Sequence, residues 1–137
     1  MDHGSTLSNG RWHVAGGRTV IYCGSSRAIC QLEKRVHANG ARPKNQALYR
    51  LVLPDTALTI TAESLGLDPQ WHTDEAITQA LGMSWLASDA SLALSVPSFI
   101  EPHERNILIN PKHPDYKNVT LHIERNPFSF DIRLFQP

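Results

Sequence analysis

An excess of charge of one sign, long apolar runs and secretory features are all missing from this chain. Its 137 residues include 13 Lys and Arg against 13 Asp and Glu, so the formal net charge is zero and no basic footprint for DNA or RNA is present. No apolar run approaches the roughly 20 residues of a membrane span, and the N-terminus lacks the charged and apolar regions of a secretory signal. We therefore expect a cytoplasmic protein that by itself binds neither nucleic acid nor a membrane.

Cysteine is scarce, and histidine shows no metal-type spacing. The two cysteines are Cys23 and Cys30, and we expect both to be reduced thiols. The seven histidines are scattered singly, and no pair has the spacing of a zinc site. The sequence thus predicts no bound metal.

Length and organisation indicate one domain over residues 1–137, which is long enough to bury a core. The sequence contains no internal repeat, no low-complexity tract and no sign of a second domain. Residues 1–8 are polar and contain glycine, and we expect them to form a mobile N-terminal arm or an active-site flap.

The segment from residue 9 to residue 40 predicts a strand, a tight turn, a second strand and a helix. Paired glycines within residues 15–18 supply the positive φ values that hairpin loops need. A four-residue loop there would place Arg11 directly opposite Tyr22, whereas a three-residue loop would put them on opposite faces. The sequence alone does not choose between the two registers.

The helix of this segment has clear boundaries. Ser25 and Ser26 can cap its first turn, and Asn39-Gly40 is a common way for a helix to end. At about 100° per residue, one stripe of the helix is apolar and is predicted to be buried. This stripe consists of Ile29, Leu32 and Val36.

A carboxylate, Glu33, borders the predicted buried stripe. It lies roughly 40° from Ile29 around the helix axis. Burying an unpaired charge is costly, so a carboxylate at this position needs a reason. A salt bridge, or a position at the edge of the stripe where the side chain reaches water, explains the carboxylate of Glu33 as well as a catalytic role does.

The rest of the chain alternates short β-type runs with helical segments. We predict strands at residues 47–53, 58–62, 91–96, 107–110, 119–123 and 128–130, and helices at residues 73–81 and 84–88. The total is six or seven short strands and two or three helices in mixed order. This pattern predicts a compact α+β fold with a largely antiparallel sheet.

Six short motifs follow one another in a fixed order over nearly the whole chain. They are Asn9-Gly10-Arg11-Trp12 with the strand Val20-Ile21-Tyr22, the helix from Arg27 to Glu33, Leu81-Gly82-Met83-Ser84-Trp85-Leu86, Val96-Pro97-Ser98, Asn106-Ile107-Leu108-Ile109-Asn110-Pro111-Lys112-His113-Pro114, and Phe130-Asp131-Ile132-Arg133-Leu134. In this order they resemble the RES domain, which is named for its arginine, glutamate and serine. That domain is the toxin half of bacterial Xre–RES toxin–antitoxin pairs, among them ParT-like and MbcT-like toxins.

The resemblance has departures. Asn9 stands where the family has a first glycine, His13 where an asparagine often follows the tryptophan, and Ile132 where proline is common. None of these changes removes a residue of the arginine–glutamate–serine set. Many members carry a further N-terminal strand, so we expect the sheet edge near Arg11 to differ from theirs. The compact length is similar to that of ParT-type members.

The resemblance implies a fold similar to that of ADP-ribosyltransferase toxins and NAD+ as the substrate. It implies cleavage of the nicotinamide–ribose bond, with ADP-ribose passing to a protein, to water or to phosphate, and an arrest of growth. A protein target such as phosphoribosyl pyrophosphate synthetase is implied by some relatives. An Xre-type antitoxin that blocks the cleft is the implied partner in a type II system. The acceptor and the oligomeric state stay open.

The resemblance also implies roles for four residues. Glu33 would stabilise positive charge on the ribose or hold its hydroxyls, and Arg11 would clamp the phosphate or the carboxamide. Tyr22 would offer an aromatic face to nicotinamide, and Ser98 would bind the substrate or orient Glu33. Other polar residues are expected to be structural: Asn106 and Asn110 hold a loop and His113 a turn, while His13 could line the pocket.

Two other function classes fit the sequence less well. A catalytically inactive module that binds an antitoxin is compatible with the motifs, although the intact set of Arg11, Tyr22, Glu33 and Ser98 argues against decay. A ribonuclease toxin needs an acidic metal cluster or a basic RNA-binding face, and the sequence shows neither. Loss of NAD+ when the protein is expressed in cells favours the NAD+-cleaving enzyme, and loss of RNA with NAD+ intact favours the nuclease.

Overall fold

The computed structural model describes residues 10–136, so the predicted N-terminal arm lies outside the described residues. In chain order the elements are β1 (Ile21–Gly24), α2 (Arg27–His37), β2 (Gln46–Val52), β3 (Thr59–Thr61), α3 (Glu75–Ser88), β4 (Ala93–Pro97), β5 (Arg105–Ile109) and β6 (Thr120–Phe128). Short 3-10 turns connect several of them. None of the described helices has the length and hydropathy that a bilayer crossing requires.

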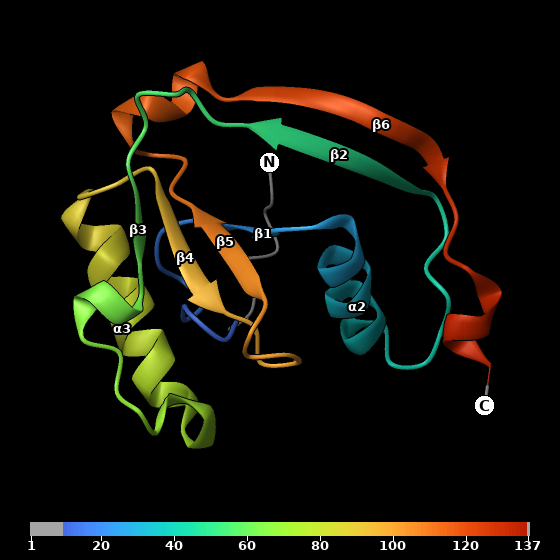
Figure 1. The fold of residues 1–137 in the computed structure, drawn as a ribbon, viewed down its shortest axis with the longest axis horizontal. Helices are drawn as coiled ribbons and strands as arrows, with labels where there is room; N and C mark the ends of the chain where they lie inside the picture. The colour runs from blue at the N-terminus through green and yellow to red at the C-terminus, as the bar shows by residue number, and fades with distance from the viewer. Residues whose placement is uncertain (1–9, 137) are drawn as a thin grey trace.

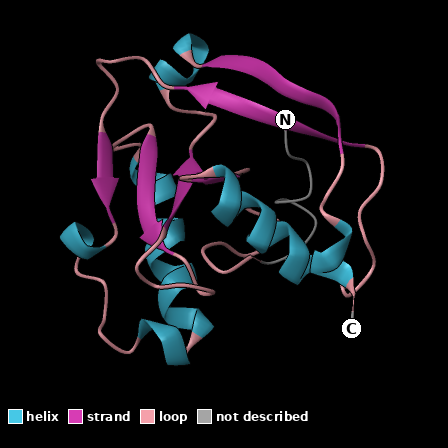
Figure 2. Cartoon of the chain, turned by 45° about the vertical axis from the view of Figure 1, so that its right-hand side comes forward, coloured by secondary structure: helices cyan, strands magenta, loops and turns pink. Residues whose placement is uncertain are grey.

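The strands form two separate sheets. A four-stranded sheet has the order β1-β5-β4-β3, in which only the β3–β4 pair is parallel. β2 and β6 form an antiparallel ribbon that passes above α2 and the four-stranded sheet (Figure 1). Figure 2 shows the same separation between ribbon and sheet from another side. The predicted α+β class, with two α-helices and largely antiparallel pairing, is confirmed.

The main core lies between α3 and one face of the four-stranded sheet. Trp85 on α3 packs with Leu94 of β4 and Leu108 of β5, and Trp12 joins the same cluster. All four side chains are at most 2% exposed. Burial of each of these large side chains stabilises the folded state by about 1.5–3 kcal/mol. The α3 helix and the sheet therefore form the rigid part of the molecule.

α3 is one continuous helix, so the prediction of two helices split near Gly82 is wrong. The helix begins at Glu75 and not at residue 73 as predicted, and the side chain of Asp74 caps it by accepting a hydrogen bond from the backbone N–H of Ala76. Gly82 is needed inside the helix because the backbone of Trp12 lies directly against it, where a Cβ atom would overlap the Trp12 carbonyl. Close packing, and not a break in the helix, explains this glycine.

The predicted hairpin is also wrong. The glycine pair does make a turn, with φ of 83° at Gly16, but residues 11–19 form no strand. β1 pairs instead with β5, and Tyr22 lies opposite Leu108. Neither of the two predicted registers therefore relates Arg11 to Tyr22.

The start and end of α2 are as predicted, but its apolar stripe is not. Ser26 caps the first turn by accepting the N–H of Ile29 at 3.1 Å, and Asn39 and Gly40 have positive φ after the last turn. Ile29 is 2% exposed, whereas Leu32 and Val36 are 40% and 56% exposed. Only the first turn is buried, because there α2 packs against the end of β1 at Gly24, and the later turns extend beyond the sheet.

Candidate active site

The carboxylate of Glu33 is held by two neutral donors from the four-stranded sheet. The hydroxyl of Ser98 and the side-chain amide of Asn106 each donate to its Oε1 atom at 2.8 Å. Oε2 has the imidazole of His37 at 3.9 Å, and in the described part of the chain no Lys or Arg forms an ion pair with Glu33. One oxygen is thus fixed in place by two hydrogen bonds.

Ser98 lies directly after β4 and is fully buried. Its hydroxyl oxygen accepts hydrogen bonds from the backbone N–H groups of Ile100 at 3.0 Å and Glu101 at 3.3 Å, while its proton goes to Glu33. A hydroxyl with this many partners is well fixed. Of the two roles predicted for Ser98, the geometry favours orienting Glu33.

The sequence did not predict the contact that Asn106 makes. Asn106 lies in β5 opposite Gly24 of β1, and this small residue lets the first turn of α2 approach β1 closely. The Oδ1 atom of Asn106 is buried and has no hydrogen-bond partner among residues 10–136. An amide that is kept in the sheet with one unsatisfied atom needs an explanation. The hydrogen bond that its side-chain NH₂ donates to Glu33 explains why an asparagine lies at this position.

Tyr22 supports the turn that carries Arg11. Its hydroxyl lies 2.6 Å from Nδ1 of His13 and accepts the backbone N–H of Trp12 at 3.3 Å. The turn is closed by a bond from the N–H of Gly10 to the carbonyl of His13. His13 is 3% exposed, so its ring is packed on Tyr22 and does not form an open pocket wall.

Arg11 and Glu33 meet the same short segment that follows β4. The guanidinium of Arg11 lies over the ring of Phe99, 4.6 Å from its centroid, and Glu33 is bonded to the preceding residue, Ser98. Arg11 is paired with the carboxylate of Glu75 at 2.9 Å in an exposed ion pair. The structure therefore brings Arg11, Glu33 and Ser98 to one corner of the fold, although Arg11 has another carboxylate as its ion-pair partner.

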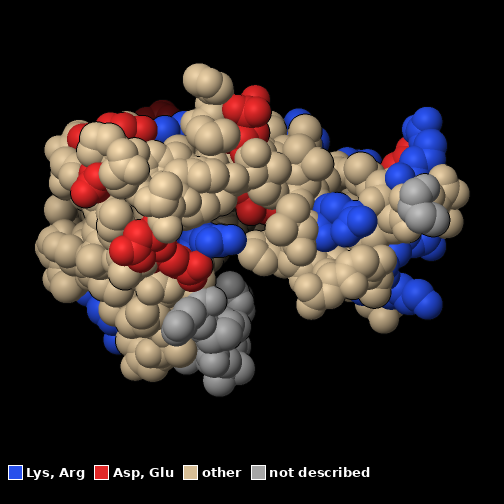
Figure 3. Space-filling view, turned by 90° about the horizontal axis from the view of Figure 1, so that it is seen from below, with Lys and Arg blue, Asp and Glu red and all other residues tan. Residues whose placement is uncertain are grey.

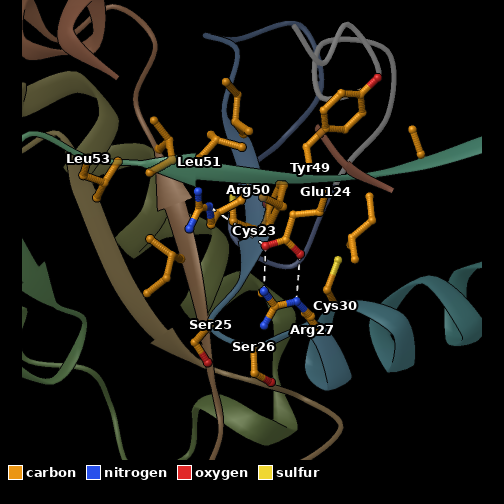
Figure 4. Close-up of a pocket in the computed structure, with 17 residues that line it drawn as sticks. Cys23, Ser25, Ser26, Arg27, Cys30, Tyr49, Arg50, Leu51, Leu53 and Glu124 are labelled. Atoms are coloured by element: carbon orange, nitrogen blue, oxygen red, sulfur yellow. Dashed lines mark hydrogen bonds and ion pairs between the residues drawn. The ribbon is translucent and has the colours of Figure 1, made fainter. Parts of the chain in front are cut away.

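A cavity of about 630 Å³ is a different site. It lies between the β2–β6 ribbon and β1, and is lined by residues such as Cys23 and Ile107, which alternate along their strands with Gly24 and Asn106. It therefore faces the side of the sheet opposite the Asn106 side chain. In Figure 4, Glu124 points from the ribbon toward Arg27, which binds it through two hydrogen bonds of 2.6 and 2.7 Å.

The ionisable groups of this cavity show no activated nucleophile. Burial raises the pKa of the Cys23 thiol to about 11 and also raises that of Cys30. Both cysteines are free, as predicted. A thiol with a raised pKa is a poor nucleophile at neutral pH, so the chemistry of interest stays at Glu33. The described residues include no group of three or more His, Cys, Asp or Glu side chains able to hold a metal ion.

Comparison with known proteins identifies close relatives. Residues 1–131 match the family described as RES domain. The chain is 37% identical over 121 residues to a Sphingobium sp. protein named "Prs ADP-ribosylating toxin", covering 85% of this chain and 74% of the relative. It is 36% identical over 135 residues to "Toxin Res" of Pseudomonas putida, covering 96% and 90% of the two chains. A Yersinia enterocolitica protein, also named "Toxin Res", is 31% identical over 140 residues, covering 96% and 88%.

Proposed function

The chain belongs to the RES domain family, and on that basis we propose that it is a toxin that cleaves the nicotinamide–ribose bond of NAD+ and transfers ADP-ribose to a protein. The observation that carries the proposal is the fixed carboxylate of Glu33, with Oε1 held by Ser98 and Asn106. The printed name of the Sphingobium relative describes an ADP-ribosylating toxin and supports the same reaction class.

The chemistry explains why a carboxylate with neutral partners suits this reaction. When the bond between nicotinamide N1 and ribose C1′ breaks, the electron pair leaves with nicotinamide and positive charge develops on the ribose. A carboxylate paired with Lys or Arg would have much of its charge cancelled. Ser98 and Asn106 fix Glu33 through hydrogen bonds without adding a positive charge, so its charge acts on the sugar.

Arg11 and Tyr22 complete the proposed substrate site. Arg11 is exposed and stacked on Phe99, and its fork of donors suits a phosphate or the carboxamide of nicotinamide. To bind substrate, Arg11 exchanges its ion pair with Glu75 for hydrogen bonds to the phosphate or the carboxamide. The hydroxyl of Tyr22 is engaged with His13, so the ring face is the part of Tyr22 that we propose for contact with nicotinamide.

The proposed acceptor is phosphoribosyl pyrophosphate synthetase, because the name of the Sphingobium relative includes Prs. The acceptor's side-chain N or O atom forms a bond to C1′ and gives up one proton, and nicotinamide leaves. NAD+ and acceptor thus give ADP-ribosyl-acceptor, nicotinamide and a proton. If water or phosphate takes the acceptor's place, the same site performs hydrolysis or phosphorolysis. Growth arrest through this chemistry, and an Xre-type antitoxin that covers the cleft, belong to the same proposal.

The test follows both products. The purified chain is incubated with NAD+ alone, with added phosphate, and with phosphoribosyl pyrophosphate synthetase, and both nicotinamide and ADP-ribose are measured. We expect nicotinamide release in all cases to depend on Arg11, so that Arg11→Ala loses it while the matched surface variant Arg50→Ala keeps it. Covalent ADP-ribose on the synthetase identifies a transferase. No nicotinamide release by folded protein under any condition contradicts the proposal and leaves the inactive binding module.

A further inference from the structure

The cavity between the β2–β6 ribbon and β1 lies on the face of the four-stranded sheet that α3 does not cover. Ile107 and Ile109 of β5 line this cavity, whereas Leu108 between them packs with Trp85 of α3. Neighbouring side chains of a strand point to opposite faces, so the cavity and α3 lie on opposite sides of the sheet. The cavity therefore needs an explanation of its own, separate from the candidate active site.

The ribbon is fixed at both of its ends, and it spans the space below it (Figure 1). At one end, Leu53 after β2 and Val119 before β6 pack against a buried cluster of the sheet. At the other end, Arg35 of α2 lies over the ring of Phe135, which packs against a cluster that includes Leu48 of β2. Because both ends are anchored, the cavity below the ribbon is a built feature of the fold.

Apolar side chains form most of the cavity wall. They are Ile21, Cys23, Ile107 and Ile109 on the sheet, Cys30 on α2, and Ala47, Leu48, Leu51 and Leu53 on the ribbon side. The raised pKa values of the two thiols keep them neutral at neutral pH, so they add no charge to this wall. Sites for small ligands have volumes of about 300–1,000 Å³ and mostly apolar walls with few polar groups. The volume of about 630 Å³ and the lining fit such a site.

Three charged side chains line the same cavity, and they leave one positive charge in excess. Arg27 binds Glu124 through hydrogen bonds of 2.6 and 2.7 Å, while Nε of Arg50 lies 3.9 Å from the same carboxylate. Figure 4 shows Arg50 and Glu124 on one side of β2 and the ring of Tyr49 on the other. Arg50 is more loosely paired than Arg27, so its guanidinium is the group that can bind an anion.

The wider charge distribution favours an anion at this end of the molecule. Residues 34–50, which include the end of α2 and most of β2, contain five Lys and Arg and no acidic residue. Figure 3 shows basic side chains at the narrow end of the molecule and most acidic side chains of this face on the broad end. Clustered charge of one sign raises the local concentration of the opposite ion.

We propose that the cavity binds a small molecule with an apolar body and one anionic group, an aliphatic or aromatic carboxylate. The apolar body lies on the isoleucine and cysteine side chains of β1 and β5, and the carboxylate accepts hydrogen bonds from Arg50. The site is separate from the NAD+ site at Glu33 and does not rest on the proposed function. Cys30 lies one helical turn before Glu33, so a ligand in the cavity contacts the helix that carries Glu33.

Thiol reactivity reports directly on this cavity, because the chain has two cysteines and both line it. The probe is decanoate, and 1-decanol is the matched probe with the same chain and no charge. Affinity and stoichiometry are measured by calorimetry, and the rate of alkylation by neutral N-ethylmaleimide is followed by mass spectrometry. The variants are Arg50→Ala and the cavity-filling Ala47→Phe, and the control is Arg42→Ala, an exposed arginine that does not line the cavity.

We expect one decanoate to bind per chain and to slow alkylation of both cysteines. Decanol should bind about tenfold more weakly, because it lacks the charge-assisted hydrogen bond to arginine. Arg50→Ala should lower the affinity for decanoate to that for decanol and leave decanol binding unchanged. Ala47→Phe should weaken binding of both probes, and Arg42→Ala should change neither. NAD+ should not slow alkylation, and nicotinamide release by Arg50→Ala should stay at the wild-type rate.

Several results would overturn the proposal. Alkylation that decanoate does not slow, or binding of several molecules per chain with unchanged alkylation, reduces the interaction to an adventitious one at the surface. Equal affinity for decanoate and decanol, or unchanged binding by Arg50→Ala, refutes an anionic ligand at Arg50. Protection of the thiols by NAD+, in competition with decanoate, assigns the cavity to the substrate and refutes a separate site. None of these results depends on whether the chain cleaves NAD+.

Discussion

The side-chain amide of Asn106 donates to the carboxylate of Glu33 at 2.8 Å, across 73 positions of sequence. The contact joins β5 to α2 and fixes the same oxygen that Ser98 holds. The orientation of the carboxylate is therefore set by the rigid sheet and not by the helix that carries Glu33. We expect loss of the Asn106–Glu33 hydrogen bond to affect catalysis more than loss of an ordinary surface hydrogen bond would.

Asn106→Ala should lower kcat for nicotinamide release by about tenfold or more, because a hydrogen bond to a charged group contributes about 1.5–3 kcal/mol. The KM for NAD+ should change less, since Asn106 acts through Glu33. Combined with Ser98→Ala, the loss should be less than the product of the two single effects, because both donors serve one oxygen. Steady-state kinetics on the two single variants and the double variant check this, and fully multiplicative effects would contradict it.

Glu75→Gln should improve binding of NAD+. The exposed ion pair with Glu75 competes for the Arg11 guanidinium, and pairs of this kind contribute about 0–1 kcal/mol. Release of Arg11 should therefore lower the KM about two- to threefold, with little change in unfolding free energy. A KM that rises in the variant would show that Glu75 positions Arg11 for the substrate.

Tyr22→Phe should separate the hydroxyl from the ring. The hydroxyl holds His13 and the Trp12 N–H, so its loss should lower the free energy of unfolding by about 1 kcal/mol. The ring remains, and activity should fall much less than in Tyr22→Ala. Thermal unfolding and kinetics measure the two effects, and equal activity losses in both variants would rule out the ring as the contact with nicotinamide.

Gly82→Ala gives opposite expectations from propensity and from structure. Helix propensity alone favours Ala over Gly by about 1 kcal/mol in a helix interior. The added Cβ would overlap the Trp12 backbone, so we expect a net loss of about 1–3 kcal/mol instead. Denaturant unfolding measures the sign, and Ala80→Gly on the exposed side of α3 serves as the propensity control. A stabilised Gly82→Ala variant would contradict the observed packing.

The Arg27–Glu124 pair should stabilise the ribbon in a pH-dependent way. Hydrogen bonds from Arg27 lower the pKa of Glu124 below its ordinary value of 4.5. A carboxylate with a lowered pKa contributes stability that is present above its unfolded pKa and is lost as pH falls through the folded value. Glu124→Gln should thus be less stable than wild type at neutral pH, and the difference should shrink below about pH 4. A difference independent of pH would contradict this.

Local signals in the sequence were sufficient for some of the fold. The cap at Ser26 and the end of α2 just before Asn39 and Gly40 depend on nearby residues only, and both were predicted correctly. The hairpin failed because a glycine turn does not decide what the next strand pairs with. β1 gains more by joining β5 in the core than by pairing with residues 11–14.

Other features depend on contacts that sequence spacing cannot show. The continuity of α3 through Gly82 depends on the close approach of the Trp12 backbone, 70 positions earlier, which sequence spacing does not show. The stripe of α2 has the right period for burial, yet the helix extends beyond the sheet that would bury it. The contact of Asn106 with Glu33 requires the β1–β5 register, which pairs Asn106 with Gly24. Family resemblance indicated Arg11, Tyr22, Glu33 and Ser98, and their roles in catalysis stay a prediction.

The most direct test of the account is the rate of nicotinamide release from NAD+ by Glu33→Gln, compared with wild type and with Glu104→Gln as an exposed control. The variant keeps the size of the side chain and removes its charge. We expect a loss of about 100-fold or more, as for a group that stabilises charge in the transition state, and no loss in the control. A folded Glu33→Gln protein that releases nicotinamide at the wild-type rate would contradict the assignment of Glu33 as the catalytic carboxylate.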